Sequence, residues 1–212
     1  MFDKIIETNN KKISIQITNQ GEVILKKPKK YKKELVDKFV ASKQKWIEDH
    51  KKQALDNMQK NIDIINGNTI LLNGVEKKLT IGAKQNKIGD KEVFAKTQKS
   101  LVTMIKKYAL EQVTEKGKFW AKKIGVEPTG FAIENTIRRW GACSSKKQIK
   151  INFRAIMLDK DCFDYVLIHE LCHLKEFNHS PKFWNIVKKY EPNYSIYRKK
   201  LKDYGFLLEM YR

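Results

Sequence analysis

Alternating apolar and polar residues in the first half of the chain predict two β-hairpins. In the first, every second residue over 13–17 is isoleucine, and a Gln20-Gly21 turn leads into the apolar run 23–25. In the second, an Asn73-Gly74 turn follows the apolar run 70–72. Alternation with a period of two is typical of half-buried strands, and Asn-Gly is a preferred two-residue hairpin turn.

Residues 32 to about 58 and about 100 to 123 instead carry apolar residues at helical spacing, so each segment is predicted as one long helix. The first helix is basic and amphipathic, and the residues on its expected buried side are Val36, Phe39, Val40, Trp46 and Ile47. A strand over 126–134 and further helices are expected beyond. The predicted fold class is α+β, with an N-terminal β-rich part with one long helix over residues 1–95, packed on a second part over residues 96–212.

Three of the four histidines of the chain fall within eleven residues, which read His-Glu-Leu-Cys-His-Leu-Lys-Glu-Phe-Asn-His from His169 to His179. The first five form an H-E-x-x-H pattern. On a helix, His169 and His173 lie one turn apart on the same face, so both imidazoles can reach one metal ion. Glu170 neighbours that face and can act as general base on water. The pattern indicates a metal-dependent hydrolase.

Apolar residues surround this motif, so the helix is expected to be buried. Unpaired histidine and glutamate side chains are costly in such a place, and a metal ion would supply their partner. A purely structural metal site would not require Glu170. The motif also contains Cys172, which is more typical of a small buried hydrophobe than of a ligand.

Catalytic zinc sites commonly use three protein ligands and keep one position for water, whose pKa the ion lowers to about 7. His179 is the leading third ligand. We expect the chain to turn at Phe177-Asn178, because asparagine tolerates the left-handed conformation that ends many helices. Ser180-Pro181 then has the pattern of an N-cap and first position of a new helix. The alternative third ligand is Glu191.

A second motif lies upstream, where residues 138–145 read Arg-Arg-Trp-Gly-Ala-Cys-Ser-Ser and the alternating segment Ile149–Phe153 follows. With His-Glu-Leu-Cys-His and the later Asn-His-Ser-Pro-x-Phe-Trp, these residues resemble the YgjP-like metallopeptidase family, a relative of the SprT-like and WLM zinc peptidases. The ordered set is more specific than H-E-x-x-H alone, and the resemblance covers most of the chain. Two residues depart from the family pattern: Ala142, where serine is more frequent, and Ile137, where a small polar residue is usual.

The resemblance implies a zincin-like catalytic minidomain that carries the H-E-x-x-H helix. It also implies zinc (Zn2+) as cofactor, His169, His173 and His179 as its ligands, and Glu170 as the base. Members of the family are described both as metallopeptidases and as metal-dependent nucleotide hydrolases of the UTP pyrophosphatase type, so the resemblance leaves the substrate open.

Substrate binding is expected at the upstream motif. An edge strand beside a metal can hold an extended peptide by strand addition, and Ile149–Phe153 is the candidate strand, with Lys150 and Asn152 facing outward. Arg138 or Arg139 can bind a carboxylate, a phosphate or an oxyanion. Trp140 is expected in the core, because large aromatic residues are usually well buried. Gly141 permits a close approach of the backbone.

Composition adds two expectations. The net charge of +20 makes nucleic-acid binding possible, yet only five of the 44 basic residues are arginine, and charge alone provides only non-specific affinity. The first residues lack a signal-peptide pattern and no stretch approaches about 18 apolar residues, so we expect a cytoplasmic protein without membrane contact. The three cysteines suit a reducing compartment.

The sequence therefore predicts a zinc metallopeptidase-like hydrolase that acts on peptides or proteins, with Glu170 activating water. Two alternatives remain open at this point. The first is a metal-dependent nucleotide phosphohydrolase, although no glycine-rich phosphate loop or acidic metal cluster supports it. The second is a basic nucleic-acid-associated module with a structural metal site.

Overall fold

The computed structural model describes residues 2–211 and divides the chain into two compact units, Met1–Ile65 and Asn66–Arg212. Each unit contains both helices and strands, which confirms the α+β class. The boundary expected near residue 95 falls inside the second unit, because the sheet over residues 69–95 packs within that unit: the Asn73 amide donates to the Ile156 carbonyl oxygen at 2.7 Å.

The first unit holds a three-stranded sheet in the order β1-β3-β2, followed by helices. Its elements are β1 (Lys4–Thr8), β2 (Ser14–Ile17), β3 (Val23–Pro28), α1 (Lys33–Ala41), α2 (Gln44–Lys60) and α3 (Ile62–Ile65). The predicted hairpin is the antiparallel β2–β3 pair, and β1 joins β3 in parallel. The single helix predicted over 32–58 is wrong: the chain breaks at Ser42, whose hydroxyl donates to the Phe39 carbonyl oxygen. Neither helix has a fully buried residue, and Trp46 is 38% exposed.

The second unit begins with a four-stranded sheet in the order β4-β5-β7-β6. Its strands are β4 (Thr69–Leu72), β5 (Val75–Ile81), β6 (Lys87–Ile88) and β7 (Glu92–Ala95). The predicted Asn73-Gly74 turn joins β4 to β5, and both residues have the positive φ that this turn requires, 54° and 74°. Gly74 also lies against Asp159, because a Cβ at residue 74 would be 2.7 Å from the Asp159 Cα.

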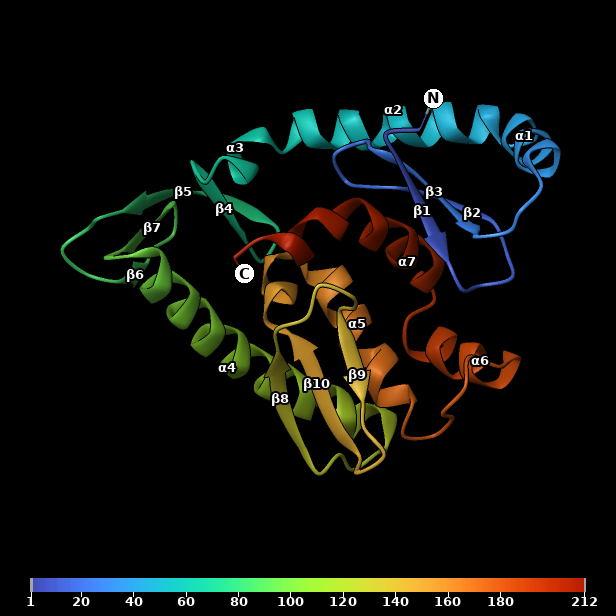
Figure 1. The fold of residues 1–212 in the computed structure, drawn as a ribbon. Helices are drawn as coiled ribbons and strands as arrows, with labels where there is room; N and C mark the ends of the chain where they lie inside the picture. Colours follow the sequence, from blue (N-terminus) through green and yellow to red (C-terminus); the bar gives the residue numbers. More distant parts are fainter. Residues whose placement is uncertain (1, 212) are drawn as a thin grey trace. The chain divides into compact units, whose positions relative to one another are not determined.

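A three-stranded sheet and two helices form the layer that carries the H-E-x-x-H motif (Figure 1). The elements are α4 (Gln98–Ile124), β8 (Gly130–Glu134), β9 (Gly141–Cys143), β10 (Gln148–Asn152), the 3₁₀ helix η1 (Phe153–Met157) and α5 (Lys160–Cys172). Helices α4 and α5 pack against each other and against the same sheet, behind it in Figure 1. Gly117 allows α4 to approach β8, since a Cβ there would lie 2.3 Å from the Phe131 ring.

The sheet order is β8-β10-β9, which corrects the expectation that Ile149–Phe153 is an edge strand. Strand β10 pairs in parallel with β8 on one side and antiparallel with β9 on the other. Ile149 and Ile151 face the core as predicted. Strand β9 is an edge strand, because β10 is its neighbour on one side and no strand in the described part of the sheet lies on the other. It also contacts α5.

Helix α5 is capped by Asp159, whose carboxylate accepts the Cys162 amide at 3.0 Å, and it buries almost every face. The helix ends at Cys172. The chain bends at Phe177 and Asn178, where the turn was predicted, but the left-handed conformation expected of Asn178 is wrong, because Asn178 has no positive φ. Ser180 and Pro181 begin α6 (Pro181–Tyr190) as predicted, with the Ser180 hydroxyl accepting the Phe183 amide. Helix α7 (Tyr194–Asp203) and the 3₁₀ helix η2 (Tyr204–Glu209) complete the chain.

In the described part of the chain, no helix combines the length and the apolar character needed to cross a membrane.

Candidate metal centre

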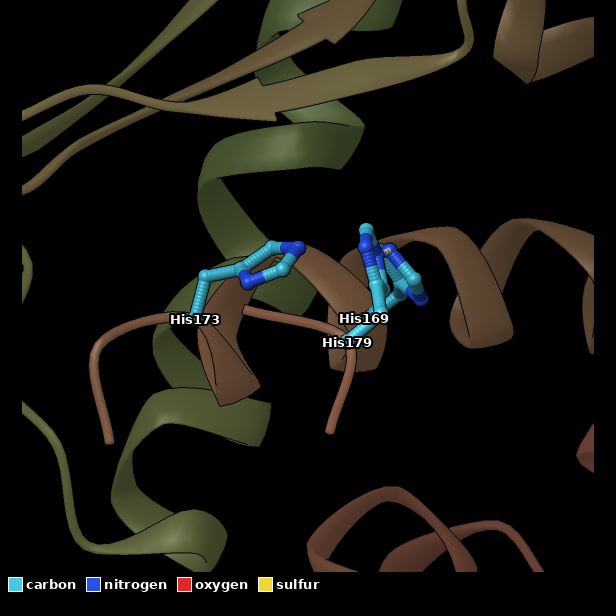
Figure 2. Close-up of side chains that lie close together, drawn as sticks. All are labelled: His169, His173 and His179. Atoms are coloured by element: carbon cyan, nitrogen blue, oxygen red, sulfur yellow. Dashed lines mark hydrogen bonds between the residues drawn. The ribbon is translucent and has the colours of Figure 1, made fainter. Parts of the chain in front are cut away.

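The three clustered histidines converge on one point at the end of helix α5 (Figure 2). His169 comes from the last turn of α5, His173 is the C-cap residue of that helix, and His179 lies on the connection to α6. One nitrogen from each ring lies within 4.8 Å of the others. The Nε2 atoms of His169 and His179 are 3.0 Å apart. The alternative ligand Glu191, at the end of α6, is not part of this group.

Hydrogen bonds and distances show which ring nitrogens are placed to bind a metal ion. Nδ1 of His173 lies 3.1 Å from the Glu176 carbonyl oxygen, so it carries the proton and leaves Nε2 free to bind a cation. Nδ1 of His169 is buried without a hydrogen-bond partner among the described residues. Two nitrogens bound to one tetrahedral zinc ion lie about 3.4 Å apart, close to the separation of the two Nε2 atoms. The residues therefore fit a zinc-like ion.

Two aromatic residues of α6 hold the imidazole rings in place. Phe183 is fully buried and stacks on His173, with ring centroids 4.5 Å apart and planes inclined by 25°. Trp184 stacks in the same way on His179, at 5.5 Å and 25°. This packing fixes the orientation of His179 although that residue is exposed.

The electrostatics of the cluster favour the neutral imidazoles of His169 and His173. Burial, followed by the charges of His173, His179 and Arg198, lowers the pKa of His169 to about 3. Burial also lowers the pKa of His173, partly offset by its hydrogen bond to the Glu176 carbonyl. Neutral imidazole is the form that binds a metal ion, so these side chains need lose no proton at neutral pH.

Glu170 is 7% exposed and lies directly against strand β9. A Cβ at Gly141 would lie 2.7 Å from the Glu170 Cγ, so only glycine leaves room for this carboxylate. Burial raises the pKa of Glu170 to about 8, and the negative charge of Glu134 adds to the effect. The charge of Arg139 and a hydrogen bond from the Cys143 backbone amide act in the opposite direction.

Glu170 and the three histidines open on a cleft of about 770 Å³. The cleft is lined by the segment 139–143, which includes β9, and by residues of α5, α6, α7 and the connection between α5 and α6. The other lining residues from these helices and their connections are Tyr165, Val166, Phe177, Trp184, Arg198 and Leu201. The cleft therefore combines a potential metal site, a buried carboxylate and a strand edge.

The four residues expected to bind substrate have different places. Arg139 lines the cleft, but its guanidinium forms two hydrogen bonds with the Glu134 carboxylate, at 3.0 and 3.1 Å. Arg138 is exposed and does not line the cleft, and its backbone amide donates to the Thr136 hydroxyl. Lys150 pairs with Ala142 in the sheet and also lies outside the cleft lining.

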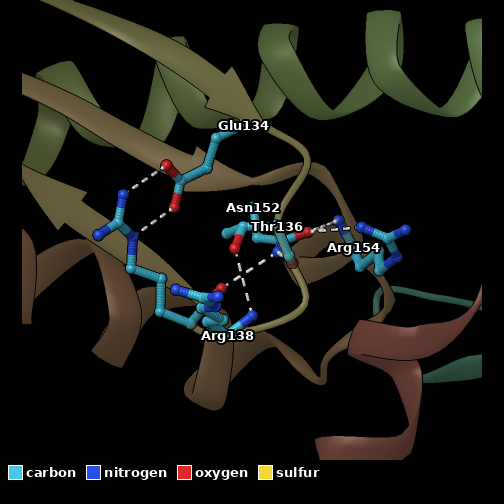
Figure 3. A network of polar contacts seen from close by, with 6 residues as sticks. Glu134, Thr136, Arg138, Asn152 and Arg154 are labelled. Atoms are coloured by element: carbon cyan, nitrogen blue, oxygen red, sulfur yellow. Dashed lines mark hydrogen bonds and ion pairs between the residues drawn. The ribbon is translucent and has the colours of Figure 1, made fainter. Parts of the chain in front are cut away.

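The outward orientation expected for Asn152 is wrong, because this side chain is fully buried. Its amide nitrogen donates to the carbonyl oxygens of Thr136 and Arg139, and its amide oxygen accepts the Arg154 backbone amide (Figure 3). The fully buried Arg154 guanidinium extends the network to the Asn135 side chain at 2.8 Å. Asn152 therefore shapes the loop that precedes Trp140 and does not face a substrate.

Sequence reasoning missed three residues of the cleft. Trp140, expected in the core, is half-buried and lines the cleft wall. Tyr165 lies one helical turn before His169, a spacing that could have indicated it. Arg198 comes from α7, and no local pattern links that helix to the histidine motif.

Comparison with solved structures finds the crystal structure of the metallopeptidase zymogen of Pyrococcus abyssi abylysin. It shares 23% sequence identity with this chain and has a TM-score of 0.40, and the match covers 42% of this chain and 90% of that one. Comparison with curated proteins finds no match. The model of the YgjP-like metallopeptidase domain matches residues 11–204. The chain thus belongs to the YgjP-like metallopeptidase family and is a metal-dependent, metallopeptidase-like hydrolase.

Proposed function

We propose that this protein is a zinc-dependent peptidase in which His169, His173 and His179 hold the ion and Glu170 is the general base. The observation that carries the proposal is the convergence of three imidazole nitrogens within 4.8 Å of one another, next to a carboxylate that is 7% exposed, in one cleft. A bound zinc ion would polarise the scissile carbonyl and lower the pKa of a water molecule.

The surroundings of Glu170 suit proton transfer. Gly141 and the Cys143 amide hold the carboxylate against β9, so its position is defined before substrate binds. Burial favours its protonated form, whereas a nearby cation favours the ionised form. The carboxylate can therefore take a proton from water and return it to the leaving amine.

Strand β9 replaces β10 as the strand to which a peptide would add. The Ser144 amide donates to the Gln148 carbonyl oxygen and the Asn152 amide to the Trp140 carbonyl oxygen, so residues 140, 142 and 144 direct their backbone groups toward β10. Because this direction alternates along an antiparallel strand, the backbone groups of Gly141 and Cys143 point away from β10. The Cys143 amide already bonds to Glu170, which leaves the Gly141 backbone and the Cys143 carbonyl oxygen as available partners. An extended peptide held there would lie in the cleft that the three histidines also line.

The all-imidazole ligand set argues against the nucleotide phosphohydrolase alternative, because phosphoanhydride hydrolysis usually employs Mg²⁺ with oxygen ligands. Nucleic-acid binding through the basic surface stays a prediction.

The test measures bound metal and peptide turnover in the same protein preparations, purified without a histidine tag. The wild type should contain about one zinc per chain and cleave members of a peptide library. Glu170→Gln should keep the zinc and lose turnover, while His173→Ala should lose both. His50→Ala is the matched control, because His50 is an exposed histidine of α2 whose Nδ1 bonds to the Trp46 carbonyl oxygen and whose ring packs on the Trp46 ring. Turnover retained in Glu170→Gln would refute the proposed base.

A further inference from the structure

The cleft is lined by arginine and not by lysine, although lysine is far more frequent in this chain. Only five of the 44 basic residues are arginine, yet the two cationic side chains besides the histidines in the cleft lining are Arg139 and Arg198. Arginine differs from lysine in presenting a planar fork of donors that matches the two oxygens of a carboxylate. A binding role in the cleft therefore depends on whether either fork is available.

Arg139 is not available, because the Glu134 carboxylate occupies its Nε and one terminal nitrogen. Arg198 is different. Among residues 2–211, neither an ion pair nor a hydrogen bond occupies its guanidinium. The cleft thus contains one arginine whose donors are all free to meet a ligand.

Stacking holds the Arg198 guanidinium close to the histidine cluster. Its Cζ atom lies 4.9 Å from the centroid of the Trp184 ring. Trp184 in turn stacks on Tyr194, at 5.1 Å and 18°, and on His179, at 5.5 Å and 25°. The charge of Arg198 is also close enough to act on His169. The stack fixes a flexible side chain in advance, which reduces the entropy lost when a ligand binds.

We infer that Arg198 binds a carboxylate of the peptide substrate and makes the enzyme prefer peptides with such a group near the scissile bond. This inference rests on the proposed peptidase function. The carboxylate has two possible sources, the C-terminus of the peptide or an aspartate or glutamate side chain. Both present the same pair of oxygens to the fork, so the experiment must separate them.

The experiment compares three peptides with the same cleavable core: one with an amidated C-terminus and glutamine, one with a free C-terminus and glutamine, and one amidated with glutamate. A hydrogen-bonded charge pair in a cleft predicts a preference of about 10- to 100-fold in kcat/KM for one of the two carboxylate peptides over the neutral one. Whichever peptide is preferred identifies the source. In Arg198→Gln the preference should fall to about twofold or less.

Two further variants sharpen the result. Arg198→Lys should restore little of the preference, because lysine lacks the fork and the stacking plane. Lys199→Gln is the matched control, since it removes one positive charge from the next residue of α7, outside the cleft lining, and should keep the preference. Equal turnover of all three peptides by the wild type would overturn the inference. So would an Arg198→Gln variant that lowers turnover of the three peptides by the same factor.

Binding of the same peptides to Glu170→Gln, measured by calorimetry, separates this inference from the peptidase proposal. The carboxylate peptide should bind at least tenfold more tightly than the neutral one, and the added Arg198→Gln substitution should abolish the difference. If the wild type cleaves no peptide, the peptidase proposal fails, while the calorimetry still decides whether Arg198 recognises a carboxylate.

Discussion

A methyl group added at Gly141 would press on the side chain that we propose as the general base. The three atoms nearest to a Cβ at this position all belong to Glu170: Cγ at 2.7 Å, Oε1 at 2.9 Å and Cδ at 3.0 Å. Carbon atoms in contact normally lie about 3.5–4.0 Å apart, so the Gly141→Ala substitution must move Glu170 or β9 by about 1 Å. Strand β9 is paired with β10, so much of the movement falls on Glu170.

A displacement of about 1 Å at a reacting group lowers turnover by about 100-fold, equivalent to about 2.7 kcal/mol of activation free energy. Overpacking should also lower the free energy of unfolding by about 1–3 kcal/mol. We therefore expect Gly141→Ala to lose about 100-fold in kcat while keeping its zinc, because no histidine is among the atoms nearest to the added methyl group.

The assay measures kcat, zinc content and urea unfolding in the same preparations. Gly130→Ala is the control, because Gly130 lies in the same sheet, lacks a positive φ and has nothing within 4 Å of an added Cβ. In a Glu170→Ala background the substitution at residue 141 should cost almost no stability, since the clash is then gone. A Gly141→Ala enzyme with kcat within about twofold of the wild type would refute the argument that the close approach positions Glu170.

Two further substitutions test residues outside the cleft chemistry. Asn152→Leu should lower the free energy of unfolding by about 1–3 kcal/mol, because the Thr136 and Arg139 carbonyl oxygens lose a buried donor. Urea unfolding measures this loss. A raised KM with unchanged urea unfolding would instead support a role of Asn152 in substrate binding. Asp159→Ala should cost about 1–2 kcal/mol, because it removes the N-cap of α5 and the ion pair with Lys200, as urea unfolding will show. Burial tends to raise the pKa of Asp159, but hydrogen bonds from Lys200, the Cys162 amide and Tyr204 outweigh it and hold the pKa below its ordinary value. The stability advantage of the wild type over Asp159→Ala should thus be full above about pH 4 and disappear as the pH falls through that lowered pKa, and an advantage unchanged down to pH 2 would contradict this account.

Local features of this protein were determined by the sequence alone. The Asn73-Gly74 turn, the Ser180-Pro181 helix start and the pairing of His169 with His173 on one helix all depend on residues close together in the chain. Their geometry follows from backbone preferences and helical periodicity, which act over a few residues. The same reasoning placed His179 at a corner near the other two histidines, although it gave the corner a left-handed Asn178 that the structure does not have.

Only the tertiary structure decided how distant segments meet. Alternation along 149–153 could not show whether β10 lies at the edge or in the centre of its sheet, because strand order depends on pairing partners elsewhere in the chain. For the same reason Asn152 was expected to face outward. Its side chain is buried instead, because its amide donates to the Thr136 and Arg139 carbonyl oxygens of the loop before β9. The approach of Gly141 to Glu170 and of Arg198 to the histidines joins residues about 20 to 30 positions apart. Such contacts arise from the packing of β9, α5 and α7, which no local pattern specifies.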